Sequence, residues 1–351
     1  MILLVVVLAG FAGATYFTFP AWDDFDYSSL VLQKGFWEFP NYHYFAWGGR
    51  YTSNFLIAAM IHTSPTWQNY GLWSLGIVLT TYVSQWLMAR TVSEFNKTPL
   101  WPTFLIFQAS VLAAAPTIIQ YFYWITGAVY YTSGVIATGL GICLLFARER
   151  RASWLTDLSL LFVTVFIVGN NEISMLGWLE ILATYGVLKY FKTNKIDASL
   201  LGIIIIGSLC GLASIAAPGN FVRQAHFEKS GRVFRTLGNG ILHYFIFSIK
   251  LLSFPTAIVI LRFRRELVNL ASKLLAGIDE KKAKWVIWVH WFLFLFSTPV
   301  LAFWAMGRKP NTRSLNVVMY YYWLSLPFIF WWIAKCWRWR IPKVWNKFCT
   351  L

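Results

Sequence analysis

The sequence predicts an all-α fold, a polytopic transmembrane bundle of about ten spans that forms a single integral membrane domain over residues 1–351. Apolar residues make up 58% of the chain and charged residues only 13%, whereas an average soluble domain has about 25% charged residues. Several apolar runs reach the roughly 20 residues that a helix needs to cross a bilayer. The 20 Trp and 17 Tyr suit a chain with many helix ends at membrane surfaces.

The net charge of +16 does not predict a nucleic-acid partner. The basic residues form short clusters between the apolar runs, as they do in membrane proteins. The four cysteines, Cys143, Cys210, Cys336 and Cys349, are scattered, and no spacing indicates a zinc site or a disulfide framework. We therefore expect membrane lipids, and no nucleic acid, around this protein.

The first apolar run, residues 2–19, has no basic n-region, so we interpret it as an uncleaved anchor and not as a signal peptide. The long loop at 20–68 follows. Its apolar stretch 51–61 is too short to span and predicts an amphipathic interfacial helix. The remaining spans are expected at 69–89, 100–115, 128–146, 154–168, 173–187, 198–216, 238–261, 285–305 and 315–334, with a basic cytoplasmic loop at 262–284.

The basic clusters set the orientation. With ten spans and the N-terminus inside, most of the 30 Lys and Arg fall in cytoplasmic segments, which is the positive-inside bias. Counting 51–61 as a full span would turn the later basic clusters outward, so we exclude it. Both termini are then cytoplasmic.

With this topology, the polar motifs that are hardest to explain as ordinary loop residues all lie on the outer face of the membrane. They are Asp23, Asp24 and Asp26, Gly48-Gly49-Arg50, Tyr123-Trp124, Gly169-Asn170-Asn171-Glu172, Pro218-Gly219-Asn220 with Arg223, and Arg308-Lys309 with Arg313. The acidic stretch has two interpretations. It is a wet loop that begins a helix, with Asp23 or Asp24 as N-cap, or it supplies a general base or a cation site at the mouth of a membrane-embedded pocket.

The other motifs also have simple structural explanations. Gly169–Glu172 and Pro218-Gly219-Asn220 suit tight turns, and Tyr123-Trp124 suits an aromatic belt. The cluster from Arg308 to Arg313 favours function, because positive charge outside opposes the topological bias. Lys250 and Glu180 fall inside spans, where charge is costly and usually paired or functional, and the sequence does not say whether they pair with each other.

Outer carboxylates together with outer arginines predict a division of labour. Arg binds a phosphate, often in bidentate fashion, while a carboxylate removes a proton from a hydroxyl. Apolar surface beside both would hold a lipid tail. These are the parts needed to move a sugar from a lipid phosphate to an acceptor outside the cytoplasm.

On these residues the chain resembles the GT-C superfamily of membrane glycosyltransferases. Members carry an acidic motif in the first outer loop, here Asp23-Asp24, and an amphipathic helix in that loop, here including 51–61. Together with Gly49-Arg50, Asn171-Glu172 and Pro218-Gly219-Asn220, the pattern is similar to a bacterial GT-C-like family of unknown function. The layout similarity covers most of the chain, although each motif is short. The chain is short for the superfamily, and no soluble outer domain follows its last span.

The resemblance implies a polyprenyl-phosphate-linked sugar as donor, a glycan, lipid or protein acceptor, and a site on the outer face of the bacterial inner membrane. It implies Asp23 as general base, with Asp24 second, in one inverting displacement. Glu172 is a second carboxylate, and either Asp24 or Glu172 is the candidate ligand if a divalent metal is used. The implied donor-phosphate residues are Arg50, Arg223, Arg308 and Arg313, and the implied substrate-pocket residues are Tyr123, Trp124, Asn171 and Asn220.

The sequence is also compatible with two other functions. An O-antigen polymerase or ligase also uses outer arginines, and often lacks an essential acidic pair. A transporter or flippase of lipid-linked glycans would show internal repeats and broken spans near the midplane, and the sequence shows no convincing repeat. Nothing in the chain resembles a P-loop, an HExxH motif or a Ser/His/Asp set.

Overall fold

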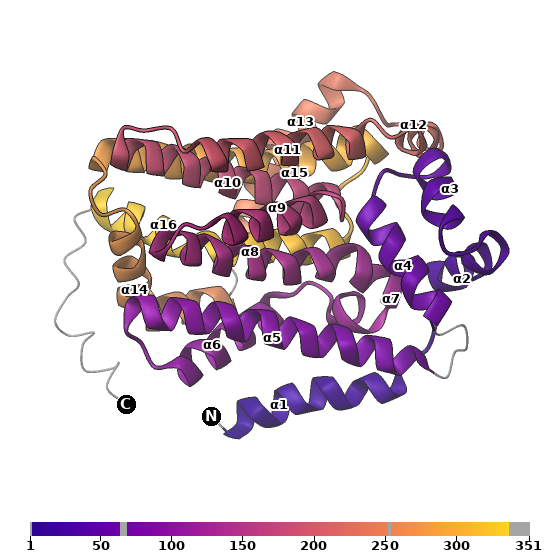
Figure 1. Ribbon diagram of the computed structural model, residues 1–351, viewed down its shortest axis with the longest axis horizontal. Coiled ribbons are helices and arrows are strands. Elements are labelled where there is room, and N and C mark those ends of the chain that lie inside the picture. Colours follow the sequence, from indigo (N-terminus) through magenta and orange to yellow (C-terminus); the bar gives the residue numbers. More distant parts are fainter. Residues whose placement is uncertain (1, 64–68, 252–253, 337–351) are drawn as a thin grey trace.

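The computed structural model describes residues 2–63, 69–251 and 254–336, and every regular element in these ranges is a helix (Figure 1). The first third holds α1 (Ile2–Gly13), η1 (Ala14–Phe17), α2 (Asp23–Lys34), α3 (Glu38–Ala46), α4 (Tyr51–Thr63), α5 (Tyr70–Asn96) and α6 (Leu100–Ala114). The middle holds η3 (Ile119–Tyr123), α7 (Ile125–Gly127), η4 (Ala128–Thr132), α8 (Ser133–Arg150), α9 (Trp154–Val168), α10 (Glu172–Thr193) and α11 (Ala198–Ile215). The last part holds α12 (Pro218–Ala225), α13 (Val233–Leu251), α14 (Phe254–Leu274), α15 (Glu280–Met306) and α16 (Thr312–Cys336).

Side-chain caps explain where several long helices begin. The side chains of Ser153, Asn171, Asp197 and Asp279 each accept a hydrogen bond from a backbone N–H in the first turn of α9, α10, α11 and α15, respectively. Such caps satisfy the N–H groups that a helix leaves free at its start. At the other end of α15, Gly307 has a φ of 63°, the left-handed conformation that closes a helix.

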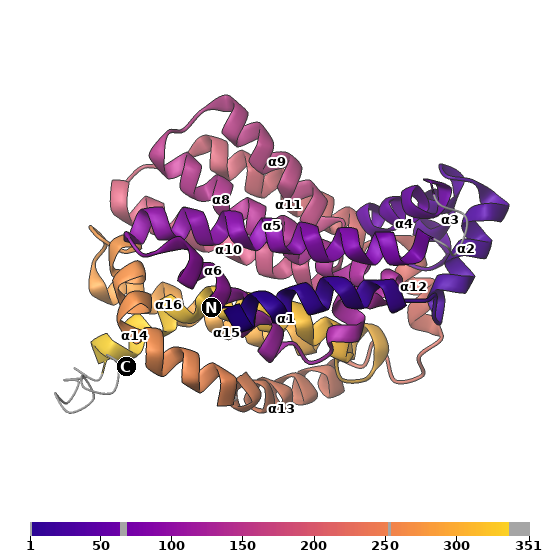
Figure 2. The same cartoon turned by 90° about the horizontal axis from the view of Figure 1, so that it is seen from below.

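The long helices lie side by side, and α10 occupies the middle. It packs against α9, α11, α15 and α16, while α5 packs on α8 and α13 packs on α15. Figure 2 shows α1 running beside α5 at the edge of this bundle. Close approach depends on small residues, as is usual inside membranes. A Cβ atom added to Gly141 of α8 would lie 2.3 Å from the ring of Trp178 in α10.

Within the described residues, five helical segments are long and apolar enough to cross a membrane: Tyr70–Asn96, Ile125–Arg150, Ala198–Ile215, Glu280–Met306 and Thr312–Cys336. Val5–Phe17 and Trp154–Val168 are shorter apolar helices. The expected all-α architecture is therefore confirmed in the described residues, and these apolar helices are consistent with an integral membrane protein. The expectation of ten spans goes beyond the five segments that meet these criteria.

Two segments differ from the sequence prediction. The eighth predicted span, 238–261, falls on two helices, α13 and α14, and α14 continues to Leu274 through the segment expected as a basic loop. The apolar stretch 51–61 forms α4, whose Ser53, Asn54, Ile57 and Ala58 are buried. Helix α4 therefore packs into the protein instead of lying flat on its surface, because its polar side chains find partners inside.

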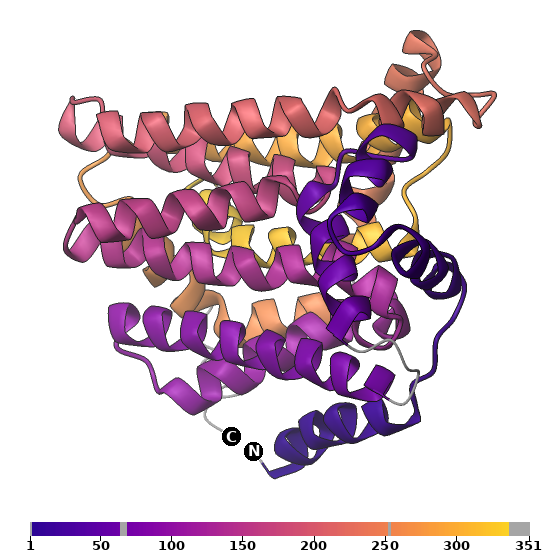
Figure 3. The same ribbon diagram turned by 45° about the vertical axis from the view of Figure 1, so that its right-hand side comes forward.

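Helices α2, α3, α4, α7 and α12 gather at one end of the bundle, on the right in Figure 1 and in front of the long helices in Figure 3. Helix α3 packs against both α4 and α12. The same end receives the start of α10 and the end of α11. The outer motifs expected from the sequence therefore meet at one end of the molecule, which we call the site end.

Candidate functional site

The backbone turns of the site end fit together without space for extra atoms. A Cβ atom on Gly49 would lie 1.9 Å from the carbonyl oxygen of Ser214, and the Ser214 hydroxyl donates to the carbonyl of Gly49 (3.0 Å). A Cβ atom on Gly219 would lie 2.5 Å from the backbone nitrogen of Gly48. These glycines let the turn before α4 contact the turn between α11 and α12.

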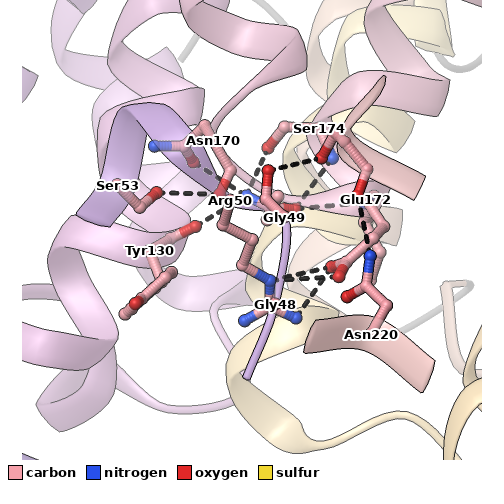
Figure 4. Close-up of polar contacts among 12 residues, drawn as sticks. Gly48, Gly49, Arg50, Ser53, Tyr130, Asn170, Glu172, Ser174 and Asn220 are labelled. Carbon is pink, nitrogen blue, oxygen red and sulfur yellow. Dashed lines mark hydrogen bonds and ion pairs between the residues drawn. The ribbon is translucent and has the colours of Figure 1, made fainter. Parts of the chain in front are cut away.

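A third turn joins them between α9 and α10. The backbone N–H of Thr52 donates to the carbonyl of Gly169 (3.0 Å), and the Ser53 hydroxyl donates to the carbonyl of Asn170 (2.8 Å). The Asn170 amide reaches in turn to the carbonyl of Val129 in η4 (3.2 Å). Four segments that are far apart in sequence are thus held in fixed positions around Arg50, as Figure 4 shows.

Glu172, the first residue of α10, is held by two arginines. Arg50 donates from Nη2 to Oε2 at 2.7 Å and from Nε to both carboxylate oxygens at 3.1 Å, and Arg223 Nη2 lies 3.3 Å from Oε1 (Figure 4). Burial alone would raise the pKa of Glu172, but the charges of Arg50 and Arg223 outweigh it and lower the pKa to about 2. The carboxylate is therefore ionised and paired. It acts as a clamp between the start of α4 and α12.

Asn220 orients the second arginine of this clamp. Its side-chain oxygen accepts a hydrogen bond from Arg223 (3.1 Å). Its amide donates to the carbonyls of Ser214 (2.7 Å) and Ile215 (3.0 Å) at the end of α11. Asn220 thus fixes Arg223 and closes α11 at the same time.

The ring of Tyr131 in η4 lies between two guanidinium groups. The Cζ atom of Arg50 is 5.8 Å from the ring centroid, and the Cζ atom of Arg313 is 5.7 Å from it. Arg50 also lies over Tyr130 (5.3 Å), and Arg313 over Trp124 (4.7 Å). These distances fit cation–π contacts, so aromatic rings of η4 and its neighbours link the Glu172 clamp to Arg313.

Asp23 lies on the other side of Arg313. Its carboxylate is 4.0 Å from Arg313 Nη1, and its side chain is 46% exposed. Partial burial raises the pKa of Asp23, Arg313 opposes this shift, and Asp24 and Asp26 add to it. The preceding residue, Trp22, has a φ of 48°, which is rare for a residue with a side chain. Such a strained position beside an accessible carboxylate is common at functional sites.

Asp24 has a different environment. It is only 5% exposed and accepts hydrogen bonds from four donors. These are the Tyr70 hydroxyl (2.5 Å), the Ala21 backbone N–H (2.9 Å), and the Thr126 N–H (2.9 Å) and hydroxyl (2.6 Å). Asp24 therefore ties the start of α2 to α5 and α7. Asp26 is exposed, as expected from its position on the helical turn.

Of the substrate-pocket candidates Tyr123, Trp124 and Asn171, one lies at the Asp23 site and two make structural contacts. Trp124 supports Arg313 with its ring and donates to the carbonyl of Ala21 (3.1 Å), so it belongs to the Asp23 site. Tyr123 donates to the carbonyl of Phe11 in α1 (3.0 Å). Asn171 is 1% exposed, caps α10 and donates to the carbonyl of Tyr130 (2.7 Å), which makes it a structural residue.

Arg308, the fourth phosphate candidate, lies apart from the other three. It is exposed, and its Cζ atom is 5.3 Å from the ring of Phe227, a residue between α12 and α13. The other phosphate candidates, Arg50, Arg223 and Arg313, all contact Glu172, Asp23 or the rings between them. The reason is geometric, since Arg308 follows the end of α15 whereas Arg313 lies in the first turn of α16.

Sequence reasoning missed several residues of this site. Tyr130 donates to Asn54 (2.5 Å), and His43 is buried beside Tyr27, with 5.1 Å between ring centroids. Burial, helped by the nearby positive charges of Arg50 and Arg223, lowers the pKa of His43 to about 4. His43 is therefore neutral at pH 7. No local motif marks these residues, since each is defined by partners from distant segments.

Asp24 and Glu172 are the two candidate metal ligands from the sequence. Within residues 2–63, 69–251 and 254–336, no group of three or more His, Cys, Asp and Glu is arranged to hold a metal ion. The oxygens of Asp24 accept from neutral donors, and those of Glu172 accept from guanidinium groups. Of Asp23, Asp24 and Glu172, Asp23 has the fewest polar contacts among the described residues.

No protein-family model matches the chain, and neither a curated protein nor a solved structure matches it. The contacts of Asp23, Arg313 and the Glu172 clamp are therefore the features from which a function can be inferred.

Proposed function

We propose that this protein is a GT-C-type membrane glycosyltransferase that moves a sugar from a polyprenyl-phosphate lipid to an acceptor hydroxyl. The observation that carries the proposal is the pair of Asp23 and Arg313, with 4.0 Å between Oδ2 and Nη1. It combines a partly exposed carboxylate, which can take a proton, with a guanidinium group that can bind phosphate. Both lie at the end of a bundle of apolar helices that can accommodate a lipid chain.

The reaction is a single inverting displacement. Asp23 removes the proton of the acceptor hydroxyl as its oxygen attacks the anomeric carbon of the sugar, and the bond from that carbon to the lipid phosphate breaks. The lipid phosphate leaves with the bonding electrons, and Arg313 stabilises its negative charge. The Arg313 side chain has donors to spare, because its Nε is buried without a hydrogen-bond partner among the described residues.

The Glu172 clamp supports this site from a distance. Arg50 and Arg223 together carry two positive charges against the one negative charge of Glu172, so the cluster keeps a net charge of +1. Arg50 reaches toward Arg313 across Tyr131. In this proposal the cluster attracts the anionic donor to the site end and holds the aromatic rings in place, while Glu172 itself is not a base.

The proposed setting is the bacterial inner membrane, with ten spans, both termini in the cytoplasm and the site end facing outward. The charge pattern supports this orientation. The last turns of α8, α10 and α16, which carry basic residues such as Arg150, Lys192 and Lys335, lie at the opposite end of the bundle from α2 (Figure 1). That distribution fits the positive-inside rule.

The test is sugar transfer by the purified protein from a polyprenyl-phosphate sugar, with Asp23→Asn and its neighbour Asp26→Asn as matched variants. Loss of a general base costs about 10²–10⁴ in rate, so Asp23→Asn should lose that factor while Asp26→Asn keeps the parent rate. Arg313→Gln should weaken donor binding, whereas Arg308→Gln should leave it unchanged. Full activity of Asp23→Asn would remove the assigned base.

Asp23→Asn, compared with Arg50→Gln and Arg223→Gln, separates this function from a lipid-linked glycan polymerase or ligase. An enzyme of that type would depend on the outer arginines without needing the acidic pair. Activity that survives Asp23→Asn but is lost in Arg50→Gln or Arg223→Gln would favour it over the proposed glycosyltransferase.

A further inference from the structure

Glu180 of α10 is a carboxylic residue far from the site end. It lies midway along its helix, two turns after the Glu172 clamp, at the interface with α15. The Ser297 hydroxyl of α15 is 3.5 Å from Oε1, which is a weak contact, and Oε2 is buried without a hydrogen-bond partner among the described residues. Carboxyl groups inside a membrane bundle are rare and usually functional.

A second polar pair lies one turn further along the same interface. The Thr184 hydroxyl is 3.0 Å from Nδ1 of His290 in α15. Thr184 follows Glu180 by four residues, so both lie on one face of α10. His290 precedes Ser297 by seven residues, so both lie on one face of α15. Because α10 and α15 run in opposite directions, the two pairs are consecutive layers of one polar cluster in an apolar interface.

Helix α10 makes other polar contacts closer to the site end. The backbone carbonyl of Ser174 accepts from the Tyr321 hydroxyl of α16 (3.0 Å). That hydroxyl also lies 2.7 Å from the hydroxyl of Thr138 in α8. Gly177, between Ser174 and Glu180, lets the Tyr321 ring approach α10, because a Cβ atom there would lie 2.8 Å from the ring. Tyr321 therefore packs against α10 one turn before Glu180.

Among the described residues, no Lys or Arg side chain pairs with Glu180. Of the helices packed on α10, α16 contributes the phenol of Tyr321 and α15 contributes the imidazole of His290. Arg148 of α8 pairs at the far end with Asp157 of α9 and with Asp197, the N-cap of α11, and Lys189 also contacts Asp197. The other ionised groups of α8, Glu149 and Arg150, pair with Lys189 and Glu94 at that same end. A carboxylate at Glu180 would therefore be a buried charge without compensation.

We propose that Glu180, Ser297, Thr184 and His290 form a proton-binding site inside the membrane bundle, with Glu180 held as a neutral carboxylic acid at physiological pH. Binding converts the carboxylate and one proton into the acid, which needs no further reactant. A protonated Glu180 fits this environment, because burial in an apolar interface costs a neutral group less than a charged one. Its hydroxyl can also donate a hydrogen bond, which a carboxylate cannot. Thr184 and His290, one turn further along α10, provide a second polar pair that includes a group able to bind a proton.

The site is independent of sugar transfer, so its test needs no substrate. An apolar carbodiimide reacts with a carboxyl group only in its protonated form. The acid adds across one C=N bond, and the acyl group then moves to nitrogen to leave a stable acylurea. The full-length protein is treated with dicyclohexylcarbodiimide at pH 7 in lipid vesicles, and modified residues are mapped by peptide mass spectrometry.

We expect the acylurea on Glu180, with its yield falling as the pH is raised, and no label on the exposed and ion-paired Glu149 and Glu94. Glu180→Gln should lose the label, whereas Glu149→Gln should keep it. An unlabelled Glu180 would overturn the proposal. Protection by Na⁺ or K⁺ would instead assign a metal-cation site to these residues, and would equally overturn it.

One further variant addresses Lys250, the basic residue that the sequence places within a span and whose side chain lies outside the described part of the chain. If Lys250 paired with Glu180, the carboxylate would be ionised and would resist the carbodiimide. Labelling that occurs only in Lys250→Met would show such an ion pair and refute the proton site. Equal labelling in the parent and in Lys250→Met supports the neutral acid.

Discussion

Asp23 and Asp24 are neighbours in sequence, but their carboxylates lie in opposite environments. Asp24 is buried and accepts four hydrogen bonds, whereas Asp23 is 46% exposed and faces Arg313 at 4.0 Å. A helix turns by about 100° per residue, so adjacent side chains point in different directions. The acidic stretch therefore serves two purposes, one structural and one available for chemistry, and the two are separable by mutation.

Asp24→Asn should destabilise the fold. An amide keeps one acceptor oxygen, but its NH₂ group replaces the other. That NH₂ group would then face groups that donate to the carboxylate, such as the Tyr70 hydroxyl or the Ala21 N–H, and it cannot accept a hydrogen bond from them. Leaving a buried donor unpaired costs about 1–3 kcal/mol, so the unfolding temperature of the purified protein should fall. Asp26→Asn is the control, because Asp26 is exposed and should have no effect. Equal unfolding temperatures for the parent and Asp24→Asn would contradict the assigned structural role.

Glu172 should make the fold sensitive to acid. Its pKa in the folded protein is about 2, below the ordinary value of 4.5, so its ionised form stabilises the fold above pH 4.5. This contribution is lost as the pH falls from 4.5 toward 2. Unfolding free energy measured against pH should fall more steeply for the parent than for Glu172→Gln in that window.

The same variant carries a cost at neutral pH. Glu172→Gln leaves Arg50 and Arg223 without their shared counter-charge, and breaking a largely buried ion pair costs about 3 kcal/mol. Glu149→Gln is a suitable control, because Glu149 is 42% exposed and its nearest basic nitrogen, on Lys189, is 3.8 Å away. A neutral effect of Glu172→Gln at pH 7 would mean that the clamp does not hold α4 and α12 together.

The general architecture was predictable because it depends on composition and on short-range patterns. Apolar runs of the length of a bilayer predict helices that cross it, and capping residues such as Asn171 and Asp197 mark helix starts directly in the sequence. The common location of the outer motifs also followed from counting spans. These properties need no knowledge of which helices touch.

The roles of individual residues were less predictable because they depend on distant partners. Asp24 meets Tyr70 and Thr126, which lie 46 and 102 positions away, and Arg50 meets Glu172 across 122 positions. Arg148 looked like one more basic residue of a cytoplasmic cluster. Its side chain is in fact 3% exposed and binds the carboxylates of Asp157 and Asp197 at 2.6 Å each.

Gly49→Ala should disrupt the site end. The added methyl group would lie 1.9 Å from the carbonyl oxygen of Ser214, and since that atom belongs to a helix backbone it cannot move cheaply. Turns that now interlock would separate, so we expect a loss of several °C in unfolding temperature, in line with the 1–3 kcal/mol typical of overpacking. Gly76→Ala in α5 is the matched control, because nothing lies within 4 Å of its Cβ position. That change should be neutral or should stabilise the helix by about 0.5–1 kcal/mol.

Trp22 offers a test of backbone strain beside Asp23. Its φ of 48° and ψ of −119° suit glycine far better than a residue with a Cβ atom. Trp22→Ala loses the edge-to-face contact with Trp124 (5.3 Å between ring centroids) and keeps the strain, whereas Trp22→Gly loses the same contact and relieves it. The glycine variant should therefore be the more stable of the two, by about 1 kcal/mol or more. If alanine proved the more stable, the strained conformation at Trp22 would be refuted.

The orientation of the site end is open to chemical labelling. Arg308 and Arg151 are exposed at opposite ends of the bundle, so a cysteine at either position is accessible from one side of the membrane. Asn171, although at the site end, is 1% exposed and unsuitable. In a variant without Cys143, Cys210, Cys336 and Cys349, an impermeant maleimide added to intact cells should label Arg308→Cys. Arg151→Cys should react only after the membrane is opened. The reverse pattern would turn Asp23 and Arg313 toward the cytoplasm, where a base could not serve an acceptor on the outer face, and the proposed reaction would lose its setting.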